Sequence, residues 1–164
     1  MPISVEEFTR QAAAWLDEHG EPVPAEATDG DDHDFSVAVF HALDFDEERQ
    51  LLEDAKRWQQ LKAGAGYHAI AGSPEFGGLG LSKEHARAFA SLERGYRVPP
   101  VHESFSVTTG LIAPTVELSG TDEQTARFVA SFLAAELLCC QLFSEPGAGS
   151  DLAALACRAE RDGD

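Results

Sequence analysis

Apolar residues recur at helical spacing near the start of the chain. Four of them share one face of a helix, at intervals of three or four residues: Val5, Phe8, Ala12 and Trp15. Ser4 and Glu7 form an S-x-x-E capping box before this run, and Gly20 follows it. A capping box pairs free N–H groups at a helix start, and glycine commonly ends a helix. The pattern predicts a helix from Val5 to about His19.

Helical spacing continues through the middle of the chain. A second helix is predicted from about Asp46 to Lys62, with three residues facing inward: Leu51, Ala55 and Trp58. A third helix is expected after Ser82, ending near Gly95. The two tryptophans, Trp15 and Trp58, are expected to pack on helix faces rather than to hold a ligand.

Two further helical runs follow. Pro99 and Pro100 lead into a run that reaches Ile112. We expect it to be broken or kinked around Pro114, because proline lacks an N–H and its ring clashes with the preceding helical turn. Thr121 and Gln124 form a second capping box. The helix predicted after it carries three residues on one face: Phe128, Val129 and Phe132.

The apolar rhythm changes after residue 136. Residues 137–143, LLCCQLF, are mostly apolar without helical spacing, which is typical of a buried strand. A second strand is predicted over 155–160, and Asp162-Gly163 favours a hairpin turn. We therefore expect the chain to stop inside a β domain that it does not complete; the alternative is a frayed tail. The pattern predicts a mainly α protein of four parts: residues 1–20 form an N-terminal helix, 21–40 an acidic linker, 41–136 a helical domain, and 137–164 the truncated start of a β domain.

The charge of the chain argues against nucleic-acid partners. The 164 residues include 12 basic and 29 acidic side chains, a formal charge of −17, and no basic stripe interrupts this field. A run of 18 apolar residues, as a membrane span requires, does not occur. The acidic N-terminus does not resemble a secretion signal, and three cysteines, two of them adjacent, suit a reducing compartment. These features predict a cytoplasmic protein.

Most familiar catalytic patterns are missing from the sequence. The six histidines show no zinc-binding spacing, so we expect no metal site, and no G-x-S-x-G motif occurs. Cys139 and Cys140 are interpreted as buried packing residues. The segment 141–151, QLFSEPGAGSD, stands out because successive N–H groups in a glycine-rich turn can bind an anion. The hydroxyl of Ser144 can donate and accept at the edge of a heterocycle. A plain tight turn remains the alternative.

Four stretches of the sequence, one of which includes this segment, resemble motifs of a known protein family. CQLFSEPGAGSDLAAL (140–155) resembles the flavin-binding signature of the acyl-CoA dehydrogenase family. SPEFGGLGLS (73–82) is similar to the family's P-E-x-G-G-x-G loop, and APTVELSGTDEQTARF (113–128) to its helix–G-T-x-E-Q–helix segment. CRAERDGD (157–164) resembles the start of its middle β domain. The resemblance covers roughly residues 40–164 and implies the N-terminal helical domain of that fold, followed by the first strands of an incomplete middle β domain.

The resemblance also implies a cofactor, FAD, and residues that contact it. The backbones of Leu142 and Phe143 and the backbone and hydroxyl of Ser144 would face the flavin ring. Gly149 and Ser150 would lie near the pyrophosphate, and Ser150 would also touch the acyl-CoA substrate. A sixth residue of this set, Gln141, stands where many members have an aromatic side chain.

The reaction implied by the resemblance is α,β-dehydrogenation of an acyl-CoA thioester, with electrons passed to an electron-transfer flavoprotein. In the family the catalytic base lies in a C-terminal helical bundle, so no base is assigned in these 164 residues. Glu145 is expected to bind nearby backbone instead. Members are expected to assemble as homo- or hetero-oligomers. The alternative to a dehydrogenase fragment is a non-catalytic helical subunit or interaction module derived from the same family.

Overall fold

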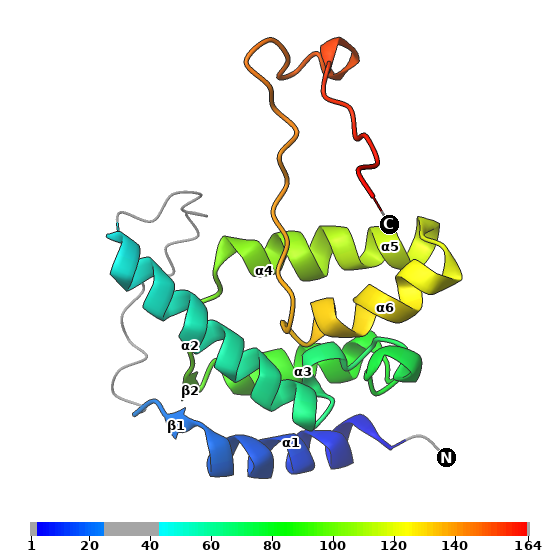
Figure 1. Ribbon diagram of the computed structural model, residues 1–164. Coiled ribbons are helices and arrows are strands. Elements are labelled where there is room, and N and C mark those ends of the chain that lie inside the picture. The colour runs from blue at the N-terminus through cyan, green and yellow to red at the C-terminus, as the bar shows by residue number, and fades with distance from the viewer. Residues whose placement is uncertain (1–2, 25–42, 164) are drawn as a thin grey trace.

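A computed structural model describes residues 3–24 and 43–163, and Figure 1 shows their arrangement. Six α-helices and one π-helical segment form the body of this part of the chain. The α-helices are α1 (Val5–His19), α2 (Phe45–Gly64), α3 (Lys83–Glu93), α4 (Glu103–Val107), α5 (Ala113–Ser119) and α6 (Asp122–Leu133). The π segment is Thr108–Ile112, and the two short strands are β1 (Glu21–Pro22) and β2 (Tyr96–Arg97). No helix in the described ranges is long and apolar enough to cross a membrane.

The first helix forms as its sequence pattern predicts. The Ser4 hydroxyl accepts the Glu7 N–H at 3.2 Å, and the helix ends at His19 with Gly20 as its C-cap. The return contact of a full capping box, in which the Ser4 N–H would donate to the Glu7 carboxylate, is not made among the described residues. One face of the helix is buried, as expected from its spacing, and it contributes three core residues: Phe8, Ala12 and Leu16.

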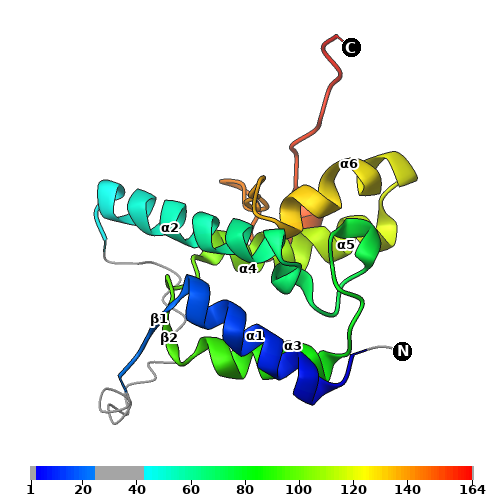
Figure 2. The ribbon, with the colours of Figure 1, turned by 90° about the horizontal axis from the view of Figure 1, so that it is seen from below.

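The main hydrophobic core lies between α1 and α3, which run side by side (Figures 1 and 2). Ile70 and Phe89 complete the buried cluster around the residues of α1. Trp15, Trp58 and Tyr67 pack against it, and the Trp15 and Tyr67 rings meet edge to face at 5.1 Å. The prediction that both tryptophans are core residues is confirmed.

The second helix crosses this layer and is slightly longer than predicted. Asp44 caps it with a complete capping box that includes Glu47. Ala55 is buried, and the Trp58 Nε1–H donates to Glu93 at 2.7 Å, which ties α2 to α3. Leu51 is only half-buried, because it lines an open groove rather than the core.

The loop over 73–82 is compact, with a short 3₁₀ turn at Pro74–Phe76. Gly78 is required here because a Cβ atom at this position would lie 2.4 Å from the Gly72 carbonyl oxygen. The next helix, α3, starts after Ser82 as predicted. The Ser82 hydroxyl does not cap it, because that hydroxyl contacts His85 Nδ1 at 2.8 Å.

Helices α4 and α5 are joined by the π segment, and α5 packs along α6 (Figure 1). The Ala113 N–H donates to the Thr108 carbonyl, five residues back, just before Pro114. The predicted irregularity around Pro114 is therefore a local widening of the helix, which accommodates a residue without an N–H. The capping box of Thr121 and Gln124 at the start of α6 is confirmed.

The observed strands differ from the sequence-based expectation in two places. Glu21 and Pro22, interpreted as linker, form β1 and pair antiparallel with β2; residues 25–40 of the predicted linker lie outside the described residues. The strands predicted over 137–143 and 155–160 are absent, and the backbone there is irregular. This segment leaves the helices after α6 and reverses direction at its tip (Figure 1), and its C-terminal end projects away from the helices (Figure 2). An isolated strand pair is marginal without a further sheet or helix to cover it, and the described chain supplies none there.

Candidate functional site

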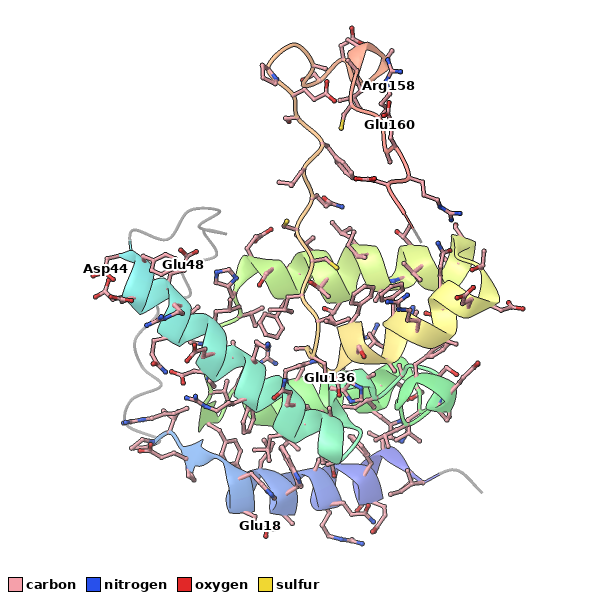
Figure 3. All side chains as sticks on the ribbon, viewed as in Figure 1. Glu18, Asp44, Glu48, Glu136, Arg158 and Glu160 are labelled. Atoms are coloured by element: carbon pink, nitrogen blue, oxygen red, sulfur yellow. The ribbon has the colours of Figure 1, made fainter. Side chains whose placement is uncertain are left out.

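The chain after α6 forms a C-terminal excursion, with an outgoing limb (residues 137–144), a tip (145–151) and a returning limb (152–163). The glycine-rich segment lies on the outgoing limb and the tip, away from the helical body (Figure 3). The Leu142 side chain is 87% exposed and the Phe143 side chain 60% exposed. The prediction of a buried strand is therefore wrong. The six residues predicted to contact a cofactor are all exposed: Gln141, Leu142, Phe143, Ser144, Gly149 and Ser150.

A buried hydroxyl anchors the base of this segment. Thr108, in the π segment, is 0% exposed. Its Oγ1 accepts the Cys139 N–H at 2.8 Å and donates to the Cys139 carbonyl at 3.4 Å. The contact fixes where the outgoing limb leaves the helices. Sequence reasoning missed Thr108, because its partner is 31 residues away and no local pattern marks the pair.

The two neighbouring cysteines differ in burial. Cys139 is half-buried, whereas Cys140 is exposed, so the packing interpretation is wrong for Cys140. Burial raises the pKa of the Cys139 thiol, and the adjacent Cys140 raises it further. A raised pKa keeps the thiol protonated at neutral pH, which makes Cys139 a poor nucleophile.

Glu145 organises the turn at the tip. Its N–H donates to the Ala148 carbonyl at 2.8 Å, and the Ala148 N–H returns a bond to the Glu145 carbonyl at 3.1 Å. Its carboxylate accepts the Cys157 N–H at 2.8 Å and the Ala156 N–H at 3.0 Å. The expectation that Glu145 binds nearby backbone is confirmed. Because both carboxylate oxygens already accept hydrogen bonds, this side chain is not arranged as a general base.

The turn leaves hydrogen-bonding groups free on both sides of the Glu145–Ala148 pair. Ser144 precedes the pair and Gly149 follows it, so the two ends of the predicted site meet at one turn. Within the described residues, the N–H groups of Gly149 and Ser150 and the Ser144 hydroxyl have no hydrogen-bond partner. A Cβ atom at Gly149 would meet nothing within 4 Å, and its φ is not positive. The fold of the described chain therefore does not require glycine at this position.

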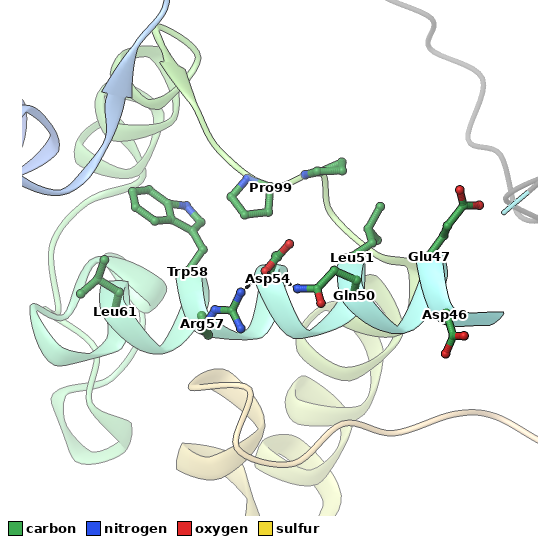
Figure 4. A pocket seen from close by; sticks show the side chains of 10 residues that line it. Asp46, Glu47, Gln50, Leu51, Asp54, Arg57, Trp58, Leu61 and Pro99 are labelled. Carbon is green, nitrogen blue, oxygen red and sulfur yellow. Dashed lines mark hydrogen bonds and ion pairs between the residues drawn. The ribbon is translucent and has the colours of Figure 1, made fainter. Parts of the chain in front are cut away.

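A second concave feature is an open groove on α2, shown in Figure 4, with a cavity volume of about 780 Å³. Leu51, Trp58 and Leu61 line its apolar part together with Pro99 and Pro100. Its aspartates are paired with arginines of the same helix: Asp46 with Arg49 at 3.2 Å, and Asp54 with Arg57. These exposed pairs offer no free acid or base for catalysis.

A smaller pocket between α2 and α6 contains His68. The Nδ1 atom of His68 is buried without a hydrogen-bond partner in the described chain. Burial lowers the pKa of this histidine, and the positive charge of Lys62 lowers it further. Among the described residues, no group of three or more His, Cys, Asp and Glu side chains is placed to hold a metal ion.

Comparison with known proteins gives this geometry a family context. The family described as acyl-CoA dehydrogenase, N-terminal domain, matches residues 4–136. The acyl-CoA dehydrogenase IpdE1 of Mycobacterium tuberculosis is 34% identical over 162 residues, which cover 98% of this chain and 38% of that protein. IpdE1 of Mycolicibacterium smegmatis is 38% identical over 117 residues, 71% of this chain and 29% of that protein. The chain thus spans less than two fifths of the length of either relative.

Solved structures agree on the fold. A variant of the Tcur3481-Tcur3483 steroid ACAD matches 98% of this chain and 37% of its own, with a TM-score of 0.56 and 24% sequence identity. At this identity the match supports the helical architecture alone. The family match ends at residue 136, so the glycine-rich turn lies beyond it.

Proposed function

The chain belongs to the acyl-CoA dehydrogenase family, and from this premise we propose that it supplies the N-terminal helical domain and the first flavin contacts of an FAD-dependent acyl-CoA dehydrogenase. The observation that carries the proposal is the exposed turn at 144–150, whose N–H groups at Gly149 and Ser150 have no partner in the described chain. Unpaired N–H groups beside an open glycine can bind the pyrophosphate of a dinucleotide.

The residues present fit a flavin nucleotide in three respects. Leu142 and Phe143 are exposed, and their N–H groups and carbonyls make no hydrogen bond within the described chain. The Ser144 hydroxyl can donate and accept at the polar edge of the ring system. The side chains of Leu142 and Phe143 are apolar and exposed, so a bound ring or a covering domain would bury them.

In this proposal the bound flavin supplies the acceptor for the hydride that leaves the β-carbon of an acyl-CoA. The chain's own residues bind and orient: Leu142, Phe143 and Ser144 at the ring, and Gly149 at the pyrophosphate. Ser150 has the further role of contacting the acyl-CoA. Gln141 lies at the start of this contact surface. An electron-transfer flavoprotein would receive the electrons, and the working protein would be a homo- or hetero-oligomer.

A pair of glycine substitutions tests the flavin site. Gly149→Ala places a methyl group where a ligand would approach, yet meets nothing within 4 Å in the described chain. Gly64→Ala, at the end of α2, is the matched control because its Cβ also meets nothing within 4 Å. We expect Gly149→Ala to lower FAD affinity about tenfold and Gly64→Ala to leave it unchanged, while neither destabilises the fold. Equal FAD affinity in both variants of the native protein would contradict the assignment of the turn.

The groove on α2 favours a second candidate function, a non-catalytic interaction module of the same family. Its apolar side at Leu51, Trp58 and Leu61 is open, and open apolar surfaces commonly bind other proteins. Leu61→Asp separates the two functions, because Leu61 lines the groove on α2 and no residue of the glycine-rich turn does. If binding another protein is the main function, the native protein contains no flavin. The Leu61→Asp variant then loses its binding partner, as measured by sedimentation.

A further inference from the structure

The tip of the C-terminal excursion depends on one side chain. The Glu145 carboxylate accepts two consecutive backbone N–H groups, from Ala156 and Cys157, at 3.0 and 2.8 Å. These partners lie eleven and twelve residues further along the chain, on the returning limb. The carboxylate therefore joins the outgoing limb to the returning limb, in addition to the backbone pair that Glu145 makes with Ala148.

Little else in the described chain holds this region in shape. Ala148 is the one buried residue among those described between 140 and 163, at 4% exposure. The ion pairs of the described chain all lie before residue 103. The hydrogen bond from the Ala154 N–H to the Asp151 carbonyl belongs to the short 3₁₀ turn Leu152–Ala154 of the described chain, so it is local and does not connect the two limbs. The distance between the limbs is thus set by the Glu145 contacts.

The same contacts engage the negative charge of Glu145 with donors other than the N–H groups of Gly149 and Ser150. A carboxylate that rotated toward Gly149 and Ser150 would compete for their N–H groups and would repel a phosphate. Bonded to Ala156 and Cys157, the carboxylate is occupied by donors of the other limb. The N–H groups of Gly149 and Ser150 then remain available to an anionic ligand.

We propose that Glu145 is a positioning residue of the flavin site: its carboxylate clamps the backbone at Ala156 and Cys157 and so holds the turn at 144–150 in the shape that receives the FAD pyrophosphate. This inference rests on the proposed function. The residue makes no contact with reacting atoms, and its effect passes through the backbone of the turn.

Two variants with the same loss of charge test the clamp. Glu145→Gln replaces one accepting oxygen by an amide group that cannot accept an N–H. Glu160→Gln is the matched control, because Glu160 lies exposed on the returning limb (Figure 3) and has no hydrogen bond in the described chain. Neither side chain makes a hydrogen bond or ion pair with an α-helix of the described chain, so we expect helix melting followed by circular dichroism to stay unchanged in both variants.

The first measurement is amide hydrogen exchange of the 164-residue chain without cofactor. In Glu145→Gln, we expect exchange at Ala156 and Cys157 to accelerate about tenfold, as for the loss of a hydrogen bond to a charged group. Exchange in Glu160→Gln stays as in the unmodified chain. Equal exchange rates in the two variants would show that the clamp does not form.

The second measurement is FAD titration of the native protein that carries this chain. We expect Glu145→Gln to weaken FAD binding about tenfold relative to Glu160→Gln, with a change in the visible flavin spectrum. Equal FAD affinity and equal spectra in the two variants, with the exchange difference present, would overturn the positioning role. If the unmodified protein binds no FAD, the proposed function fails, and the exchange measurement still decides whether the clamp exists.

Discussion

Replacing Thr108 by valine should release the base of the glycine-rich segment from the helices. The change keeps the shape of the side chain and removes the hydroxyl that accepts the Cys139 N–H at 2.8 Å and donates to its carbonyl at 3.4 Å. Thr108 is 0% exposed, so a valine leaves the Cys139 N–H facing apolar atoms. An unpaired buried donor costs about 1–3 kcal/mol. Because Cys139 is only half-buried, we expect about 1.5 kcal/mol.

The assay is hydrogen exchange at the Cys139 amide, with chemical denaturation as the global measure. A cost of about 1.5 kcal/mol corresponds to roughly tenfold faster exchange at this amide. Thr115→Val is the matched control, because the Thr115 hydroxyl donates only to the Leu111 carbonyl of the preceding turn, on an exposed face. We expect that control to change neither the Cys139 exchange rate nor, beyond about 0.5 kcal/mol, the free energy of unfolding. Unchanged Cys139 exchange in Thr108→Val would refute the anchoring role.

Three further predictions concern the helical body. Leu16→Ala should lower the free energy of unfolding by about 3 kcal/mol in urea titrations, because Leu16 is fully buried. The control Leu118→Ala, at an 84% exposed position, should change the free energy of unfolding by less than about 0.5 kcal/mol. Similar losses in both variants would contradict the assignment of Leu16 to the core. The lowered pKa of His68 means that the unfolded chain binds a proton more readily, so stability should fall as pH drops below about 6.5 and level off below the folded pKa. Between pH 7.5 and 5.5, the urea midpoint should therefore vary less in His68→Asn than in the unmodified chain. The same pH dependence of the urea midpoint in both proteins would contradict this role of His68. Thr121→Ala should cost about 1 kcal/mol in thermal or urea unfolding through loss of the helix cap, and no change would show that the cap is dispensable.

The helices were predictable because their signals are local. Ser4 and Thr121 cap helices in the structure, and Pro114 marks the irregular turn before it. Each signal depends on residues within one or two turns, where hydrogen-bond spacing and side-chain periodicity act directly. The buried face of α1 follows from the same short-range rhythm.

The errors occurred where structure depends on distant partners. The apolar run 137–143 suits a strand, but a strand needs a neighbour, and the described chain offers none to it. Glu21 and Pro22 have no strand pattern, yet they pair with Tyr96 and Arg97 because α1 and α3 lie side by side.

The residues of the candidate site could be predicted from the sequence, but the contacts that hold them in place could not. The turn at 145–151 and the backbone-binding role of Glu145 follow from its glycines and its acceptor chemistry. The Glu145 carboxylate accepts from Ala156 and Cys157 because the outgoing and returning limbs meet there. The anchoring of Cys139 by Thr108 depends likewise on tertiary contact, which no local pattern encodes.

The most direct test of the proposed function is the visible spectrum of the native protein that carries this chain, purified from its source, before and after addition of acyl-CoA thioesters. A flavoprotein dehydrogenase of this family should show an oxidised flavin band that bleaches when a suitable thioester transfers hydride to the cofactor. A purified protein without flavin that also fails to take up added FAD would contradict the account.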